Sequence, residues 1–316
     1  MKNLYKFNNC HLFWAILVIS TFANCNKLIA QQEANYTQYM YNTMALNPAY
    51  TGTVQGLQAN LLYRNQWVDV EGAPEIQNFG LHSPLRNERI GLGFHVINDK
   101  IGPSSELEIN GDFSYKLKTS YSSTLALGLN AGARVLNIDW SKGRFYDQDD
   151  VLLNDNIKNR WMPSLGAGAY FYSDNWYLGL SVPNFIRSDY YSDVQEAVLS
   201  DRIHYYVIGG YVFDLSSSLK FKPAFFSRIV SGAPLSVDIS ANFLLEEFLS
   251  LGASYRWDDS VSFLAGFQIF DSFFLGYSFD YTTSDFRKYN NGTHEVILRY
   301  TLLNDPGKIN SSPRFF

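Results

Sequence analysis

Charged residues and cysteine are scarce in this sequence, and no long apolar run follows its first thirty residues. Asp, Glu, Lys and Arg together make up 17% of the 316 residues, and there are two cysteines, Cys10 and Cys25. A membrane-spanning helix needs about 18 or more consecutive apolar residues. The missing apolar runs therefore exclude a helical membrane protein after residue 30, and the few cysteines exclude a scaffold held by several disulfides.

The first thirty residues have the pattern of a secretory signal. Lys2 and Lys6 precede an apolar stretch, residues 12–23, and we expect cleavage after Ala30. Both cysteines would then leave with the signal; the alternative is lipid attachment at Cys25. The net charge is −5 before cleavage, and loss of the signal lysines makes the mature chain more acidic. This charge argues against nucleic acid as a partner.

Aromatic residues are abundant, and they alternate with small or polar residues. Aromatics make up 16% of the chain. Between residues 234 and 302 the bulky positions follow a period of two, and two-residue breaks such as Glu246-Glu247 and Asp258-Asp259 interrupt them. Alternation of this kind predicts half-buried strands joined by antiparallel hairpins.

The face opposite the bulky residues carries Gly, Ser and ions of both signs. Ser254 and Asp280 belong to it, whereas Leu251, Phe263 and Tyr277 belong to the bulky face. A soluble β-protein would point its apolar face inward and cover its outside with charge. Small and polar residues instead suit the lumen of a membrane barrel whose bulky face meets lipid. The pattern favours an outer-membrane β-barrel over a secreted soluble β-protein.

We predict a single antiparallel transmembrane barrel of about 14 strands over residues 54–302. An N-terminal segment, 31–53, precedes it and a tail, 303–316, follows it. The expected strands are 54–67, 75–85, 89–100, 104–117, 123–140, 162–173, 176–186, 203–215, 219–230, 234–245, 248–257, 260–270, 273–283 and 293–302. The long connections, 68–74, 141–161, 187–202 and 284–292, are all odd-numbered. Outer-membrane barrels have long loops at one rim and short turns at the other, which fits this parity.

Motifs for catalysis or metal binding are missing. The four histidines after the signal, at positions 82, 95, 204 and 294, show no HExxH spacing, and there is no GxSxG. The acidic stretch from Asp147 to Asn156 has Leu152 and Lys158 where a calcium loop needs Gly and Glu. We therefore expect no enzyme activity, no cofactor and no metal.

Charges of both signs fall on the predicted inner face. They are Arg64, Glu106, Glu108, Asp112, Arg134, Asp238, Arg256, Asp280, Glu295 and Arg299. Fourteen strands enclose more space than lining side chains fill, so the lumen either conducts water or holds a plug. Segment 31–53 is the candidate plug; the alternative is a periplasmic leader.

Short motifs along almost the whole mature chain resemble the PorP/SprF proteins of the type IX secretion and gliding systems of Bacteroidetes. The residues that carry the resemblance are Gln38-Tyr39-Met40-Tyr41-Asn42, Asn47-Pro48-Ala49-Tyr50-Thr51-Gly52, Arg64-Asn65-Gln66-Trp67, Gly72-Ala73-Pro74, Gln77, His82-Ser83-Pro84-Leu85, Ile90-Gly91-Leu92-Gly93, Asn98-Asp99-Lys100-Ile101-Gly102, Tyr177-Leu178-Gly179-Leu180-Ser181-Val182-Pro183 and Ser312-Pro313-Arg314-Phe315-Phe316. Two positions depart conservatively from the family's usual residues. Tyr41 stands where the family usually has Phe, and Phe315 stands where it usually has Tyr.

The resemblance implies a non-enzymatic outer-membrane barrel that helps export or retain a surface adhesin through the adhesin's C-terminal domain. It also implies contacts with periplasmic components of the type IX machinery and with outer-membrane lipid. The motif residues are the candidates for partner docking, and Trp140, Trp161, Tyr190 and Tyr191 beside the long loops are candidates for holding the exported protein. Deletion of 141–161 is expected to leave folding intact and to abolish retention. The alternative function is a porin or a fatty-acid-type transporter.

Overall fold

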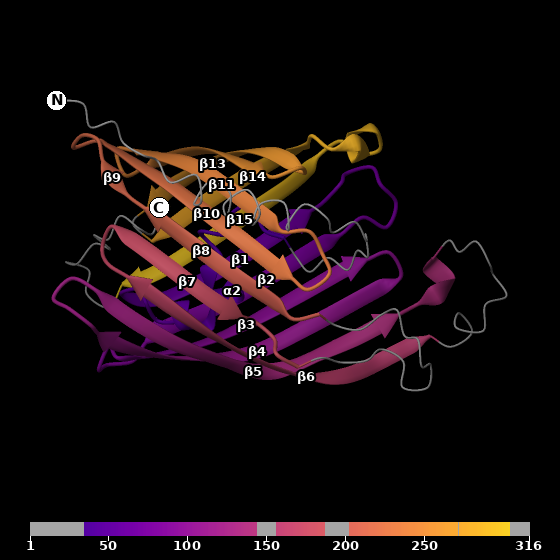
Figure 1. Cartoon of the computed structure of the whole chain (residues 1–316), viewed down its shortest axis with the longest axis horizontal. Coiled ribbons are helices and arrows are strands. Elements are labelled where there is room, and N and C mark those ends of the chain that lie inside the picture. Colours follow the sequence, from indigo (N-terminus) through magenta and orange to yellow (C-terminus); the bar gives the residue numbers. More distant parts are fainter. Residues whose placement is uncertain (1–34, 144–155, 187–201, 271, 304–316) are drawn as a thin grey trace, which may run out of the picture.

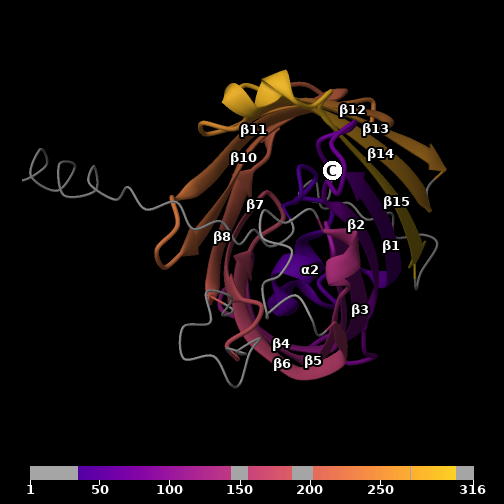
Figure 2. The ribbon, with the colours of Figure 1, turned by 90° about the vertical axis from the view of Figure 1, so that its right-hand side faces the viewer.

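The chain folds into a closed antiparallel β-barrel. The computed structural model describes residues 35–143, 156–186, 202–270 and 272–303. Within these residues each strand pairs with its neighbour in sequence, and pairing of β1 with β15 and of β10 with β11 completes the ring. Figure 2 looks along the barrel and shows the ring of strands around an interior helix. The predicted all-β outer-membrane fold is confirmed.

The elements follow one another around the barrel in sequence order. The interior carries α2 (Thr43–Leu46) and η1 (Pro48–Tyr50), and the loops carry η2 (Trp140–Lys142) and η4 (Asp285–Lys288). The strands are β1 (Gly56–Asn65), β2 (Glu75–Pro84), β3 (Ile90–Ile101), β4 (Ser104–Lys118), β5 (Thr124–Ile138), β6 (Ile157–Tyr172), β7 (Trp176–Val182), β8 (His204–Tyr211), β9 (Phe213–Asp214), β10 (Leu219–Val230), β11 (Ser236–Leu245), β12 (Leu249–Arg256), β13 (Ser260–Phe270), β14 (Phe273–Thr282) and β15 (Thr293–Leu303).

β8 and β9 are two parts of one barrel strand that is interrupted at Val212. Both pair with β10 in the same register, Gly210 with Ala224 and Phe213 with Phe221. The interruption lies beside Pro223 of β10, which has no N–H to donate to the ladder. The described barrel therefore has 14 strands, as the sequence predicts.

The largest departure from a predicted boundary is at β6, which starts at Ile157 and not at residue 162, and β7 ends at Val182 and not at residue 186. Ile157 pairs with Ile138 of β5, and the register shifts between Leu136 and Ile138. Asn159 has a left-handed backbone with a φ of 50°, and its N–H donates to Asn137 Oδ1 at 2.8 Å. This irregularity breaks the period of two, which is why the first five residues of the strand resemble a loop in the sequence.

The two faces of the barrel wall divide as the alternation predicts. Leu251, Phe263 and Tyr277 face outward and are 44%, 61% and 42% exposed, respectively. Ser254 and Asp280 face the interior and are 5% and 3% exposed. Since the apolar side chains cover the outside and the polar ones line the inside, lipid is the solvent that suits this exterior.

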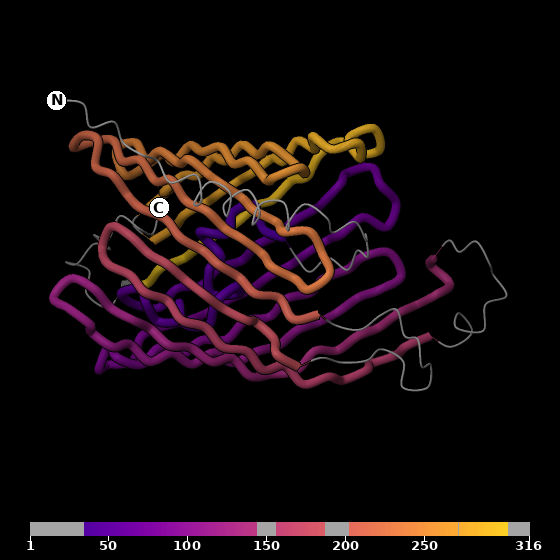
Figure 3. The backbone as a smooth tube through the Cα atoms, viewed as in Figure 1, coloured from indigo at the N-terminus to yellow at the C-terminus, as the bar shows by residue number. Residues whose placement is uncertain are grey.

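The connections differ in length between the two ends of the barrel. Loops 66–74 and 283–292, η2 and η4 gather at one end, which we call the long-loop rim (Figure 1). Tight turns such as 119–123 and 173–175 lie at the opposite end, the short-turn rim, as the tube in Figure 3 shows. The odd-numbered connections thus share one rim.

The chain before β1 lies inside the barrel. Every residue from Asn35 to Val54, which we call the N-terminal segment, is buried. Figure 2 shows α2, which belongs to this segment, at the centre of the ring. Among the described residues, no helix has the length and apolar character needed to cross a membrane.

Candidate functional site

The N-terminal segment is fixed to the barrel wall by a buried group of charges. Arg64 of β1 forms ion pairs with Asp280 of β14 at 2.8 Å and with Glu295 of β15 at 2.9 Å. The Thr37 hydroxyl donates to Asp280 Oδ2 at 2.7 Å and accepts from Arg64 at 3.0 Å. The Thr37 and Gln38 N–H groups donate to the Glu295 carboxylate at 3.0 and 2.8 Å. A buried carboxylate needs such partners to offset the loss of water. The segment supplies hydrogen-bond donors to the carboxylates of the wall.

Two tyrosines of the segment reach different strands of the wall. The Tyr39 hydroxyl lies 2.9 Å from Ser240 Oγ of β11, and its ring stacks on Phe226 with centroids 5.4 Å apart. The Tyr41 ring lies 4.6 Å from Phe274 of β14. Aromatic pairs of this kind contribute about 0.5–1.5 kcal/mol each beyond the area they bury.

The buried tyrosines of the segment keep their protons. Burial raises the pKa of Tyr36, Tyr39 and Tyr41 above the ordinary value for a phenol. For Tyr39, the hydrogen bond with Ser240 opposes this rise without cancelling it. These side chains therefore act as neutral hydrogen-bonding groups in the lumen.

Asn47 fastens the middle of the segment to β6 and β7. Its Oδ1 accepts from Ala49 N–H at 3.0 Å, which caps η1. Its Nδ2 donates to the carbonyls of Ala169 and Leu180 at 3.0 and 3.3 Å. Pro48 follows at the first position of η1, where a missing N–H costs nothing.

The segment touches the wall where glycine leaves room. A Cβ at Gly128 of β5 would lie 2.2 Å from the backbone nitrogen of Ala49. The Tyr50 ring meets His82 and Tyr170 edge to face, at 5.6 and 5.5 Å. Close packing of backbone against backbone explains why the lumen strands carry glycine here.

The segment leaves the lumen through a second set of contacts near β1. The Gly52 N–H donates to His82 Nδ1 at 3.0 Å, and Ser114 Oγ donates to the Thr51 carbonyl at 2.5 Å. Lys116 donates to the Gly52 carbonyl. Gly52 has a φ of +67° and a Cβ there would lie 2.5 Å from Gly91, so this turn requires glycine.

The remaining predicted lumen charges form separate pairs. Arg256 contacts Asp238 at 2.9 Å and Asp259 at 3.3 Å. Arg134 contacts Glu106 at 3.1 Å, and Glu108 accepts from Asn110 at 2.5 Å. Two further groups complete the lining. His95 Nδ1 lies 2.7 Å from Asp112, and the Arg299 guanidinium lies 5.4 Å from the Tyr41 ring centroid.

The candidate docking residues from Gln66 to Gly102 lie at the long-loop rim, away from the segment. The Trp67 ring packs edge to face on Phe286, with ring centroids 4.7 Å apart. The backbone N–H of Trp67 donates to the Thr293 hydroxyl at 3.1 Å. Two backbone bonds fasten the neighbouring turns: Gln66 N–H to the Pro74 carbonyl at 3.0 Å, and Gly102 N–H to the Gly72 carbonyl at 2.9 Å. Asn98 and Asp99 lie at the end of β3, paired with Gln77 and Ile76.

The candidate docking residues therefore do not form one site. Gln38, Tyr39, Asn47, Pro48 and Tyr50 belong to the interior, together with Arg64, whereas Gln66, Trp67, Gly72, Pro74, Asn98, Asp99 and Gly102 belong to the rim.

The partner-loop candidates also separate. Trp161 points outward from β6 and is 67% exposed. Trp140 packs against the cluster of Leu136, Ile138 and Met162. Tyr190, Tyr191, Pro313, Arg314 and the acidic stretch from Asp147 to Asp155 lie outside the described residues.

Sequence reasoning missed two residues of the interior. Thr37 joins Arg64 to Asp280, but a lone threonine before the Gln38 motif gives no signal of that role. Lys222 of β10 is buried in the lumen with its ammonium 5.6 Å from the Tyr41 ring centroid. Lys222 lies two residues before Ala224 and four before Phe226, so the period of two places it on the same, inner face of β10.

No group of three or more His, Cys, Asp or Glu within the described residues is arranged to hold a metal ion. The histidines lie apart: His82 contacts Gln58 and Gly52, His95 contacts Asp112, and His294 contacts Tyr277.

Comparison with solved structures returns outer-membrane barrels. Omp33 of Acinetobacter baumannii is 9% identical with a TM-score of 0.46, and the match covers 80% of this chain and 100% of that one. A FadL homologue of Pseudomonas aeruginosa is 12% identical with a TM-score of 0.47, covering 82% and 94%. The CymD monoaromatic hydrocarbon channel is 11% identical with a TM-score of 0.47, covering 87% and 95%. A search of curated proteins found no match.

The family model described as type IX secretion system membrane protein PorP/SprF matches residues 28–300. This match extends over most of the chain, from before the N-terminal segment to the last strand, and it confirms the resemblance carried by the short motifs. The chain is therefore a member of the PorP/SprF family, an outer-membrane component of the type IX secretion system.

Proposed function

We propose that this barrel serves type IX secretion as a docking module and not as a diffusion pore. In this role the long-loop rim helps export or retain a surface adhesin, and the short-turn rim docks periplasmic machinery of secretion and gliding. The observation that carries the proposal is the N-terminal segment, which lies in the lumen with all its residues from 35 to 54 buried. The family and the fold suggest secretion and not catalysis.

The contacts of the segment support a stable closure of the lumen. It is bonded to β1, β14 and β15 through Thr37 and Gln38, to β11 through Tyr39, and to β6 and β7 through Asn47. Because these strands surround the lumen, the bonds span its cross-section. Releasing the segment would remove the hydrogen bonds that Thr37 and Gln38 donate to buried carboxylates and those that Asn47 donates to two carbonyls, which is costly.

The long-loop rim offers a fixed surface to an exported protein. Val68 N–H donates to the Gly292 carbonyl at 2.9 Å, and Asn291 N–H donates to the Val68 carbonyl at 3.0 Å. These bonds join loop 66–74 to loop 284–292, and we call the pair the outer platform. Long loops of outer-membrane barrels face outward from the cell, so the platform suits an extracellular partner. Tyr289, 70% exposed, is its most prominent aromatic side chain.

Deletion of residues 144–155 tests the docking role. Deletion of 141–161, which the sequence predicts to leave folding intact, would remove residues 157–161 of β6, which pair with β5. The deletion is therefore limited to 144–155. The shorter deletion is expected to preserve heat-modifiable migration of the barrel on a gel and to release the exported adhesin from the cell surface. Adhesin that stays on the surface in this variant would remove loop 144–155, with the flanking Trp140 and Trp161, from the partner assignment.

Single-channel conductance in a planar bilayer separates this proposal from a porin or a fatty-acid-type transporter. The purified wild-type barrel is expected to be electrically silent, because the segment occupies the lumen. A steady large conductance would favour the porin and contradict the docking module.

A further inference from the structure

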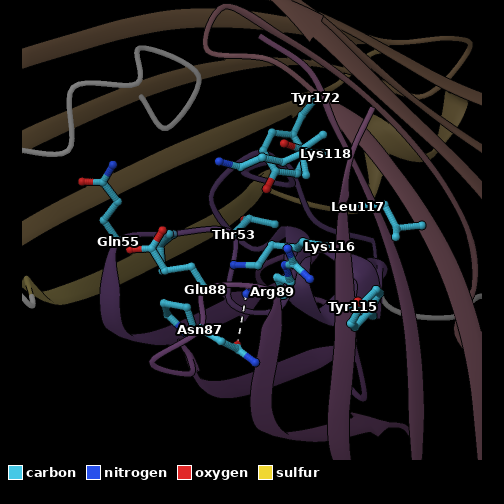
Figure 4. Close-up of a pocket in the computed structure, with 13 residues that line it drawn as sticks. Thr53, Gln55, Asn87, Glu88, Arg89, Tyr115, Lys116, Leu117, Lys118 and Tyr172 are labelled. Carbon is cyan, nitrogen blue, oxygen red and sulfur yellow. Dashed lines mark hydrogen bonds between the residues drawn. The ribbon is translucent and has the colours of Figure 1, made fainter. Parts of the chain in front are cut away.

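An open cavity of about 650 Å³ lies at the short-turn rim, below the exit of the N-terminal segment. Figure 4 shows the residues around it. They come from the chain just before β1, from the β2–β3 turn, and from the adjacent ends of β4, β5 and β6: Thr53, Val54, Gln55, Pro84, Asn87, Glu88, Arg89, Tyr115, Lys116, Leu117, Lys118, Thr124 and Tyr172. Cavities of this size hold drug-sized molecules or short peptide segments.

The cavity is basic, although the chain as a whole is acidic. Its lining has three cationic side chains, Arg89, Lys116 and Lys118, and one acidic side chain, Glu88, whereas the net charge of the whole chain is −5. A concave site with walls of one charge raises the local concentration of the opposite charge. The ligand is therefore expected to be an anion.

Lys116 and Lys118 of the cavity lie on the inner face of the wall, whereas Tyr115 and Leu117, which also border the cavity, point outward. Successive strand residues point to opposite faces, and Tyr115 and Leu117 of β4 lie on the outer face, 38% and 41% exposed. Lys116 and Lys118 consequently lie on the inner side of the same strand, as Figure 4 shows.

The rest of the lining suits a peptide better than a simple inorganic anion. Gln55 and Asn87 offer hydrogen-bonding side chains, while Pro84 and part of Tyr172 offer apolar surface. Recognition sites of this mixed kind bury apolar groups and fix orientation through a few polar ones. A phosphate ion would use the cations and leave the apolar part of the cavity empty.

The cavity adjoins the point where the N-terminal segment leaves the lumen. Thr53 and Val54 line it, and Lys116 donates to the carbonyl of Gly52 immediately before them. A ligand seated here would contact the last residues of the segment and a lysine that holds it. The cavity thus connects a periplasmic binding event with the contents of the lumen.

We propose that this cavity binds an acidic peptide segment of a periplasmic protein. The assignment of the partner to the periplasm rests on the function proposed above, in which the short-turn rim docks the secretion machinery. The contact is ionic at Arg89 and Lys118, with Pro84 and Tyr172 covering the apolar part of the peptide. Lys116 contributes charge while it holds the Gly52 carbonyl.

Fluorescence anisotropy with the full-length protein in detergent tests the site. The probe is a short fluorescein-labelled peptide of alternating glutamate and serine, compared with its glutamine counterpart. Arg89→Gln/Lys118→Gln is expected to weaken binding of the glutamate peptide about tenfold or more, because two charge contacts with the peptide are lost. The matched control, Arg287→Gln/Lys288→Gln, removes the same two residue types from η4 at the opposite rim and is expected to bind like wild type.

Three results would overturn the proposal: equal binding of the glutamine peptide, equal loss in the control variant, or full displacement by inorganic phosphate at matched charge. Rising salt should also weaken binding to the wild-type protein, and this measurement does not depend on how the variants fold. If the peptide binds in the cavity but Arg89→Gln/Lys118→Gln leaves adhesin export unchanged in cells, the result contradicts the proposed docking of periplasmic machinery at the short-turn rim. It leaves the acidic-peptide site itself supported.

Discussion

Arg64 of β1 and Glu295 of β15 face each other across the seam where the first and last strands of the barrel meet. They are register partners, and their side chains form an ion pair at 2.9 Å with almost no exposure to solvent. The same Glu295 carboxylate accepts the N–H groups of Thr37 and Gln38. The same carboxylate therefore takes part both in the seam that closes the barrel and in the attachment of the N-terminal segment.

Glu295→Gln is predicted to loosen the segment and destabilise the barrel. The amide keeps the size of the side chain but leaves the buried Arg64 with one carboxylate partner, Asp280, and weakens the bonds to Thr37 and Gln38. Breaking a buried pair in this way costs on the order of 2–4 kcal/mol. Unfolding in denaturant, followed by tryptophan fluorescence, measures the loss.

A cysteine placed in the segment reports whether it moves. Ala45→Cys, in a background where Cys10 and Cys25 are serine, is expected to resist a water-soluble maleimide because Ala45 is buried. Adding Glu295→Gln should accelerate labelling. The control Glu247→Gln breaks an exposed pair with Lys220 and should change stability by less than about 1 kcal/mol. Equal effects of the two substitutions would show that Glu295 does not hold the segment.

Gly128→Ala is predicted to displace the segment without altering the barrel wall. The added methyl group would lie 2.2 Å from the Ala49 backbone, where no flexible side chain is available to move aside. Gly111→Ala on β4 is the matched control, since its nearest contact is an ordinary 3.8 Å. We expect Gly128→Ala to raise both Ala45→Cys labelling and single-channel conductance, and Gly111→Ala to raise neither. If Gly128→Ala barrels show neither conductance nor maleimide labelling of Ala45→Cys, the close packing of Gly128 against Ala49 is contradicted.

Leu61→Arg is predicted to destabilise the barrel in a bilayer. Leu61 lies in the middle of β1, 54% exposed, and pairs with the outward-facing residues Phe79 and Leu298. Arginine on the lipid face near the membrane midplane costs about 2–4 kcal/mol, falling to about 0–1 kcal/mol near the interface. Tyr121→Arg, in the turn between β4 and β5, should therefore cost little. Unfolding from liposomes measures both, and equal costs would argue against the lipid-facing assignment of Leu61.

Stability is predicted to fall as the pH rises above about 10. Burial raises the pKa of Tyr36, Tyr39 and Tyr41, so these phenols keep their protons in the folded barrel while the unfolded chain loses them near its ordinary pKa. The stabilisation is complete below that pKa and is lost at about 1.4 kcal/mol per pH unit for each tyrosine.

Tyr39→Phe should reduce this alkaline slope by the contribution of one tyrosine. Ser240→Ala is the matched control, because it removes the same hydrogen bond without removing a titrating group. It should lower stability at every pH and leave the slope unchanged. Denaturant midpoints between neutral and alkaline pH provide the measurement, and identical slopes for wild type and Tyr39→Phe would exclude a protonated Tyr39 in the folded state.

The sequence by itself determined the strands, their faces and the distribution of loops between the rims. A period of two is a local property: Leu251 and Ser254 fall on opposite faces whatever surrounds them, and breaks such as Asp258-Asp259 mark the turns. Local information failed at Ile157–Trp161, where the left-handed Asn159 interrupts the alternation of a strand that is nevertheless paired.

Tertiary structure alone decided what lies inside the barrel and which residues meet there. Segment 31–53 was equally compatible with a plug and a leader, because its Tyr, Gln and Asn side chains suit a polar lumen and water alike. Thr37, Arg64, Asp280 and Glu295 come together because pairing of β1 with β15 brings the first and last strands of the barrel side by side. The residues in these contacts are more than two hundred positions apart in the sequence. They meet only when the barrel closes in the right register, and a local sequence pattern does not predict closure or register.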